Sequence, residues 1–130
     1  MELVEFPDPV VAVLDHLDGH LPAGTSLSLE PRPDDHRGLW VQVVDVGGAI
    51  WEQVFDDARV LVEVSCEDSI RASTVARRCD ALLRAFHTSE GRWLAQVHRP
   101  HYLPDPDIRV PAYQLTHTLR FRGVEVDTSE

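Results

Sequence analysis

The sequence has 130 residues, of which 43% are hydrophobic and 26% are charged, proportions that are typical of one globular domain with its own core. Acidic residues outnumber basic ones by 22 to 12, and the formal charge of −10 opposes binding to nucleic acid through phosphate contacts. All 12 basic residues are arginines, which excludes a Walker A phosphate loop and a Schiff-base lysine.

The first predicted element is a short helix over roughly residues 9–18. Asp8 can cap the free amides of the first turn, Pro9 suits the first helical position, and Gly19 is the expected stop. One apolar face follows from the three- and four-residue spacing of Val10, Val13, Leu14, Leu17 and Leu21.

A short strand is predicted around Leu27 and Leu29, and a second strand is predicted over Leu39 to Val46. The second strand is apolar on both sides, which indicates a central strand or a strand with one side against another subunit. Gly47-Gly48 is expected to end it. The glycine pair also suggests a loop that needs positive φ or a close backbone approach.

Residues 49–57 are predicted to form a loop, and Arg59 to Cys66 are predicted to form a third strand. Glu67-Asp68-Ser69 then marks the start of a second helix, because acids at that position complement the helix dipole. Its buried stripe is expected to comprise Ala72, Val75, Ala76, Cys79, Leu82, Leu83 and Phe86. The two cysteines are interpreted as buried free thiols.

A fourth strand is predicted over Trp93 to His98, followed by a proline-rich loop over residues 99–111. Thirteen residues without regular structure inside a small domain are unusual and often functional. Alternating apolar and polar residues from Tyr113 to Phe121 predict a final amphipathic strand. The tail over residues 126–130 is expected to be frayed.

Together these elements predict an α+β fold over residues 1–130, a single domain with its core at about residues 6–122. Its antiparallel or mixed sheet is expected to have about five strands, with two helices packed on one face. No apolar run is long enough to span a membrane, and the acidic start does not resemble a signal peptide. We therefore expect synthesis and assembly in a cytoplasm.

His98, His101, Asp105 and Asp107 together supply one possible set of metal ligands. Such a site would make the chain a small metal-dependent hydrolase. Histidines scattered in polar loops are more often surface residues, so no metal, cofactor or catalytic residue is predicted. No Gly-x-Ser-x-Gly nucleophile elbow is present, and Cys79 falls within a helix. The chain is not expected to be an enzyme.

Trp51 is the strongest candidate for recognition, because a tryptophan beside Ile50 in a polar loop can anchor an interface. The alternative is that both side chains fold back into the core. Tyr102 and Leu103, between prolines, present the same two alternatives. Prolines reduce the entropy lost when such a loop docks.

The order of these segments resembles the tail terminator (tail completion) proteins of long-tailed bacteriophages. The resemblance rests on the helix after Phe6-Pro-Asp8, the strand that ends in Gly47-Gly48, and the Asp57 to Val64 strand that leads into an alanine- and arginine-rich helix. The Leu103-Pro-Asp-Pro106 loop and the Pro111 to Leu119 strand complete it.

The resemblance implies a structural virion protein at the head-proximal end of the tail. Such a protein forms a homo-hexameric ring that caps the tail tube, stops polymerisation of the tube protein and offers a docking surface to the head connector or stopper. DNA passes through the pore without specific binding. A second interpretation is another head–tail joining (neck) protein. We assign subunit or tube contacts, as a hypothesis, to Gly47, Gly48, Ile50, Trp51, Arg59, Tyr102 and Leu103.

Overall fold

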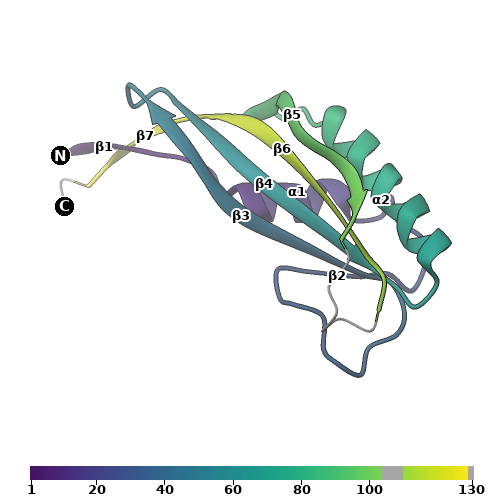
Figure 1. Ribbon diagram of the computed structural model, residues 1–130. Coiled ribbons are helices and arrows are strands. Elements are labelled where there is room, and N and C mark those ends of the chain that lie inside the picture. Colours follow the sequence, from purple (N-terminus) through teal and green to yellow (C-terminus); the bar gives the residue numbers. More distant parts are fainter. Residues whose placement is uncertain (104–109, 129–130) are drawn as a thin grey trace.

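The computed structural model describes residues 1–103 and 110–128, and it contains two sheets and two helices (Figure 1). In chain order the elements are β1 (Glu2–Glu5), α1 (Pro9–Leu17), β2 (Ser26–Ser28), β3 (Trp40–Trp51), β4 (Phe55–Ser65), α2 (Ser69–Arg84), β5 (Gly91–Tyr102), β6 (Ala112–Arg122) and β7 (Val124–Asp127). Neither helix is long and apolar enough to cross a membrane, within the residues described.

The main sheet has five strands in the order β2-β3-β4-β6-β5. β2 runs parallel to β3, and the other neighbouring pairs are antiparallel, so the sheet is mixed. The α+β class and the five-stranded sheet predicted from the sequence are confirmed.

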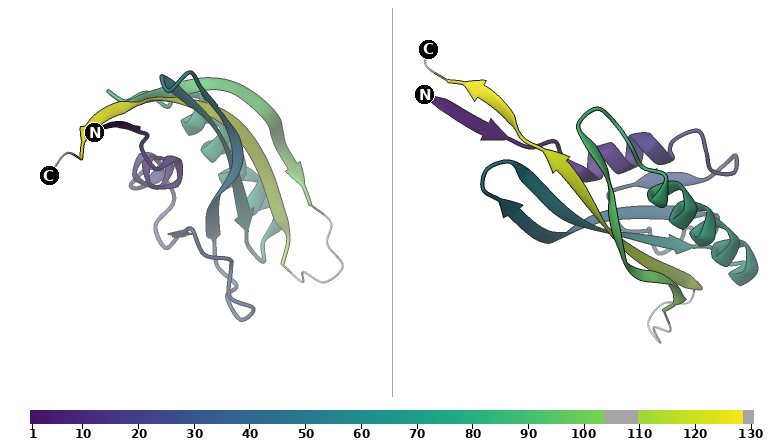
Figure 2. Two further views of the ribbon diagram at one scale, coloured as in Figure 1. Left: turned by 90° about the vertical axis from the view of Figure 1, so that its left-hand side faces the viewer. Right: turned by 90° about the horizontal axis from the view of Figure 1, so that it is seen from above.

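Both helices cover the same face of this sheet, as predicted (Figure 2). Alternate residues of β3, β4 and β6 point toward the helices and are fully or almost fully buried: Val41, Val43, Val60, Val62, Val64, Leu115, Leu119 and Phe121. Against them pack Val13 and Leu17 of α1 and the buried side of α2. Burying a side chain of this size contributes about 1.5–3 kcal/mol, so this layer dominates the stability of the fold.

Each helix begins at an aspartate cap. The carboxylate of Asp8 accepts from the backbone amides of Val10 and Val11, and that of Asp68 accepts from Ile70 and Arg71. A side-chain cap satisfies amides that the helix leaves without a partner and stabilises it by about 1 kcal/mol. The predicted start of each helix is confirmed.

The prediction that Gly47-Gly48 ends a strand is wrong, because β3 continues to Trp51 through a bulge between Asp45 and Gly48. Both glycines have positive φ, 107° and 127°. A Cβ on Gly48 would lie 2.0 Å from the carbonyl oxygen of Asp57. Positive φ and a close backbone approach were predicted correctly, but they serve a bulge within a ladder.

The loop predicted over residues 49–57 is instead the end of a β-hairpin. β3 and β4 pair up to Trp51 and Phe55, which leaves a short turn in which Glu52 and Gln53 have φ of 49° and 59°. The amide of Val54 closes this turn by donating to the carbonyl of Trp51 at 2.8 Å.

The fourth strand is also longer than predicted, since β5 runs to Tyr102 and takes in the first residues of the predicted 99–111 loop. Pro100 is tolerated because β5 is an edge strand with register shifts against β6. Residues 104–109 of that loop lie outside the described part of the chain.

The predicted frayed tail over residues 126–130 is wrong in its first part, because β7 pairs with β1 in a separate two-stranded sheet. This pair, which we call the arm (residues 2–5 and 124–127), projects from the body and carries both chain ends (Figures 1 and 2). Each segment has only four residues, rich in glutamate and valine, and gives little indication of a strand by itself. The sheet forms because the first and last strands of the chain pair with each other.

Candidate interaction surface

The face of the main sheet that the helices leave uncovered is called here the outer face. Strand alternation places on it Arg59, Leu61 and Glu63 of β4 opposite Thr118, Thr116 and Gln114 of β6. Gln114 Nε2 donates to Glu63 Oε1 at 3.0 Å, which ties the two strands together on this side. The outer face is therefore a mixed polar and aliphatic surface of the kind used for protein contacts.

Three of the predicted interface residues meet on the outer face. Gly48, Trp51 and Arg59 line one shallow groove, together with Ala49, Asp57 and Thr118. The Trp51 side chain is 54% exposed, so it does not fold back into the core. Arg59 is exposed two residues along β4 from Asp57. The sequence-based assignment thus identifies residues that share one surface.

Ile50 is also exposed, at 56%, but alternation along β3 directs it to the opposite side of the hairpin from Trp51. Gly47 sits in the bulge, where its amide donates to the Asp45 carboxylate at 2.9 Å. The Ile50–Trp51 pair, which was treated as one anchor, is therefore divided between two faces.

Tyr102 and Leu103 lie at the other end of the sheet. Tyr102 is opposite Tyr113, whereas the Trp51 hairpin ends opposite Arg122, nine residues further along β6, or about 30 Å. The Tyr102 and Tyr113 rings are 5.6 Å apart, and Leu103 is half-buried with its amide bonded to the Ala112 carbonyl. A single small contact cannot include both groups of predicted residues.

Next to the Trp51 groove, Arg120 and Asp57 form a two-pronged ion pair. Arg120 Nε and Nη2 donate to the two oxygens of Asp57 at 2.7 and 2.8 Å. The guanidinium also lies 4.7 Å over the Phe55 ring. Hydrogen bonding from Arg120 lowers the pKa of Asp57, whereas burial and the nearby Asp45 raise the pKa of its neighbour Asp56.

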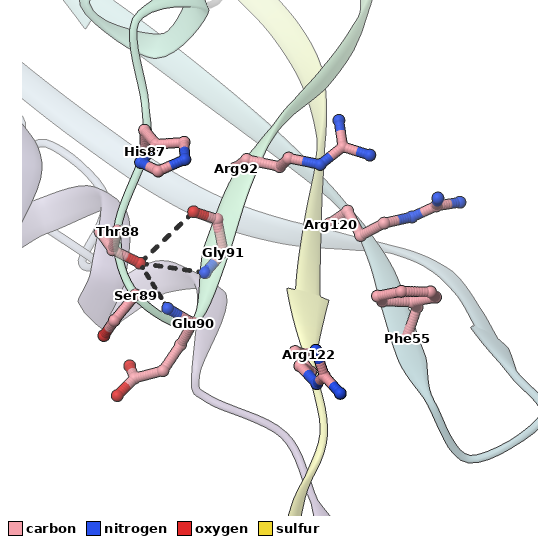
Figure 3. Close-up of a pocket in the computed structure, with 9 residues that line it drawn as sticks. All are labelled: Phe55, His87, Thr88, Ser89, Glu90, Gly91, Arg92, Arg120 and Arg122. Carbon is pink, nitrogen blue, oxygen red and sulfur yellow. Dashed lines mark hydrogen bonds between the residues drawn. The ribbon is translucent and has the colours of Figure 1, made fainter.

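The sequence reasoning missed a second groove, which we call the arginine groove. It has a volume of about 320 Å³ and is lined by Phe55, Arg92, Arg120, Arg122 and the turn over residues 87–91 (Figure 3). Thr88 holds that turn, since its hydroxyl oxygen accepts from the amides of Glu90 and Gly91 at 3.2 and 3.0 Å. Arg92 lies directly opposite Arg120 across the β5–β6 ladder.

Among the residues that the structure describes, Arg120 is the one of these three arginines that is neutralised by an ion pair. Arg92 and Arg122 are exposed and have no hydrogen-bonding or ion-pair partner for their side chains within residues 1–103 and 110–128. Like charges on neighbouring strands repel each other. An anionic partner would relieve the repulsion between Arg92 and Arg122 by forming charge-assisted hydrogen bonds with their guanidinium groups. The sequence signal was a gathering of arginines at positions 92, 120 and 122 in an acidic chain, but the register of β5 was needed to bring them together.

The structure places His98 and His101 close together on the outer face, with ring centroids 6.1 Å apart. His101 Nδ1 donates to the Arg99 carbonyl at 2.9 Å. Asp105 and Asp107, the other residues of the conceivable metal site, lie outside the described residues. Within residues 1–103 and 110–128, no three or more His, Cys, Asp or Glu side chains are grouped as metal ligands.

Cys66 and Cys79 are free and buried, as the sequence predicted. Burial raises the pKa of the Cys79 thiol to about 12, so it stays protonated and is a poor nucleophile.

Comparison with known proteins gives a match among solved structures. The chain is similar to a chain in the virion of the native gene transfer agent (GTA) particle, with a TM-score of 0.57 and 18% sequence identity. The similarity covers 88% of this chain and 93% of that chain, so the two share a fold over nearly their whole lengths. No protein-family model and no curated protein matches the sequence.

Proposed function

We propose that this protein is a structural component of a phage-like particle and acts as a tail terminator. In this role six copies form a ring on the last layer of the tail tube and stop its polymerisation. The upper surface of the ring then receives the head connector or stopper. The protein is a virion component at the head-proximal end of the tail, assembled in the host cytoplasm, with an architectural and not a catalytic task.

The observation that carries this proposal is the likeness to a chain of a gene transfer agent virion, which extends over 88% of the sequence. It concerns the arrangement of the whole domain and not one common motif. The order of segments along the sequence independently resembles the tail terminators. The exposed Trp51 and the unpaired arginines of the outer face supply the kind of surface that a multi-copy assembly buries.

The charge of the chain suits a conduit for DNA. At a formal charge of −10 per subunit, a ring of several copies creates a strongly negative potential. Phosphates are repelled by such a potential, so DNA passes without being retained. The basic side chains on the outer face are then available for contacts with protein.

The proposal is tested by native mass spectrometry and negative-stain imaging of the purified chain, alone and mixed with its tail tube protein. We expect six-fold rings, or tubes that carry one ring at an end and stop growing. A chain that remains monomeric at high concentration and leaves tube growth unchanged would contradict the proposal.

A deletion of the coding gene separates the terminator from the other neck proteins. Loss of a terminator gives particles with overlong tails, because tube growth is no longer stopped. Tails of normal length that lack heads would instead identify a head–tail joining protein.

A further inference from the structure

The arm is a two-stranded sheet that its own subunit leaves largely uncovered. Beyond its base, β1 and β7 contact mainly each other, and neither strand belongs to the buried core (Figures 1 and 2). Two strands alone are at best marginally stable in water and need a further layer against one face. An arm of this kind gains its stability when it docks.

The two faces of the arm differ in chemistry. Leu3, Val124 and Val126 lie on one face together with Glu5, and Leu3 and Val124 are 42% and 52% exposed. Glu2 and Glu125 lie on the other face, both exposed, with Asp127 beside them near the terminal amine. The arm therefore has one mainly aliphatic face and one mainly acidic face that also carries Val4, and most of its residues are exposed on their own subunit.

The arginine groove has the complementary charge at a matching spacing. Arg92 is opposite Arg120, so Arg122 is its diagonal neighbour across the β5–β6 ladder. Glu2 is opposite Asp127, so Glu125 is its diagonal neighbour across the β1–β7 ladder. Diagonal neighbours of this kind are separated by roughly 7–8 Å in both ladders, which lets two carboxylates meet two guanidinium groups at once.

We propose that the arm of one subunit docks in the arginine groove of a second copy of this chain, with Glu2 and Glu125 against Arg92 and Arg122. The inference rests on the proposed function, because it presumes assembly of several copies. The arm extends away from its own body, so it is directed toward a neighbour and not toward its own groove (Figure 2). The face of the arm that carries Glu2 and Glu125 also carries Val4, so Val4 is the aliphatic residue that this docking directs toward the Phe55 ring.

Charge reversal on each side of this contact provides the test. One variant carries Glu2→Arg and Glu125→Arg on the arm, and the other carries Arg92→Glu and Arg122→Glu in the groove. Within either variant, arm and groove carry the same sign of charge, so we expect self-association to weaken about tenfold or more. Sedimentation velocity across a concentration series measures it.

Mixing the two variants is the decisive step. The arginine arm of one fits the glutamate groove of the other, and the remaining unmodified arm and groove also match. Association in the mixture should therefore return to the level of the unmodified chain, in alternating assemblies. Arg71→Glu with Arg77→Glu on α2 is the matched control, because it changes the charge equally at two exposed positions outside the groove.

The possible results separate the two proposals. Monomeric unmodified chain, unchanged association in the reversed variants, or no recovery on mixing would each overturn the arm contact. If oligomers form but ignore the charge changes, the assembly role stands without this contact. If the mixture recovers but unmodified chain never caps tubes, the contact stands and the tail role fails. Circular dichroism of each variant verifies that it is folded.

Discussion

Trp93 donates its indole hydrogen to Nδ1 of the fully buried His117 at 2.9 Å, and this contact fixes the protonation state of the imidazole. An indole nitrogen can only donate, so Nδ1 must accept and the ring hydrogen sits on Nε2. Nε2 donates to Asp80 Oδ1 at 2.7 Å. Arg84 and Gln96 also donate to the Asp80 carboxylate, which completes a polar network between α2 and the sheet that runs from the buried His117 to the surface.

Acid should weaken the fold through His117. Burial lowers its pKa below the ordinary value of 6.5, although the hydrogen bond to Asp80 opposes this shift. Between the two pKa values the unfolded chain binds a proton that the native chain does not. The free energy of unfolding therefore falls as pH decreases below about 6.5, by at most about 1.4 kcal/mol per pH unit from this residue.

Urea unfolding at several pH values checks this expectation, with His117→Gln as the comparison. A glutamine can accept from Trp93 and donate to Asp80 without titrating, so its stability should depend less on pH. His20→Gln, at an exposed position, is the control and should keep the dependence of the unmodified chain. Identical pH profiles for His117→Gln and the unmodified protein would show that His117 is not responsible.

Gly48 should be far less replaceable than Gly47. In Gly48→Ala the new Cβ adds a clash with the Asp57 carbonyl to the strain of positive φ, and we expect a loss of about 3 kcal/mol or more. Gly47→Ala meets open space, so the φ strain alone should cost about 1–2 kcal/mol. Equal melting temperatures for the two variants would contradict the bulge geometry.

Both thiols should be silent in the native protein. Cys66 and Cys79 are each at most 2% exposed, and the raised pKa of Cys79 keeps it protonated. Ellman's reagent should give no rapid reaction at pH 8 and should titrate both cysteines after unfolding in urea. A rapid reaction of the reagent with the folded chain would mean that α2 opens easily from the sheet.

Trp51→Ala should impair assembly while leaving the fold intact. The side chain is 54% exposed, so the melting temperature should fall only slightly. Ring or capped-tube formation, scored by electron microscopy, should drop. Ile70→Ala, at a residue that is 80% exposed on α2, is the matched control. Unchanged assembly would remove Trp51 from the interface.

Local sequence signals predicted the parts of the fold that depend on local chemistry. Asp8 and Asp68 cap their helices, and the alternation from Tyr113 to Phe121 became β6. Residues that usually interrupt strands gave wrong predictions where pairing with a neighbouring strand continues past them. Gly48 and Pro100 suggested ends of strands, yet a bulge and an edge position accommodate both.

The candidate site was less accessible to sequence reasoning for the same reason. Trp51 and Arg59, both predicted as contact residues, line one groove, and their role in contacts stays a prediction. The groove of Arg92, Arg120 and Arg122 depends on how β5 pairs with β6, and that pairing contains three register shifts. No local pattern specifies which residues on two separate strands face each other in such an irregular ladder.

The irregularity of β5 has a further consequence for how copies of this chain can meet. Both edges of the sheet are irregular templates for another strand, because β5 is broken by its shifts and by Pro100, and β3, which β2 covers only at residues 40–42, has a bulge between Asp45 and Gly48. Regular exposed edges allow sheets to join end to end without limit, as in aggregates and fibres. These irregularities at both edges disfavour open-ended growth and favour contacts between copies of this chain through faces and grooves, which can close on themselves.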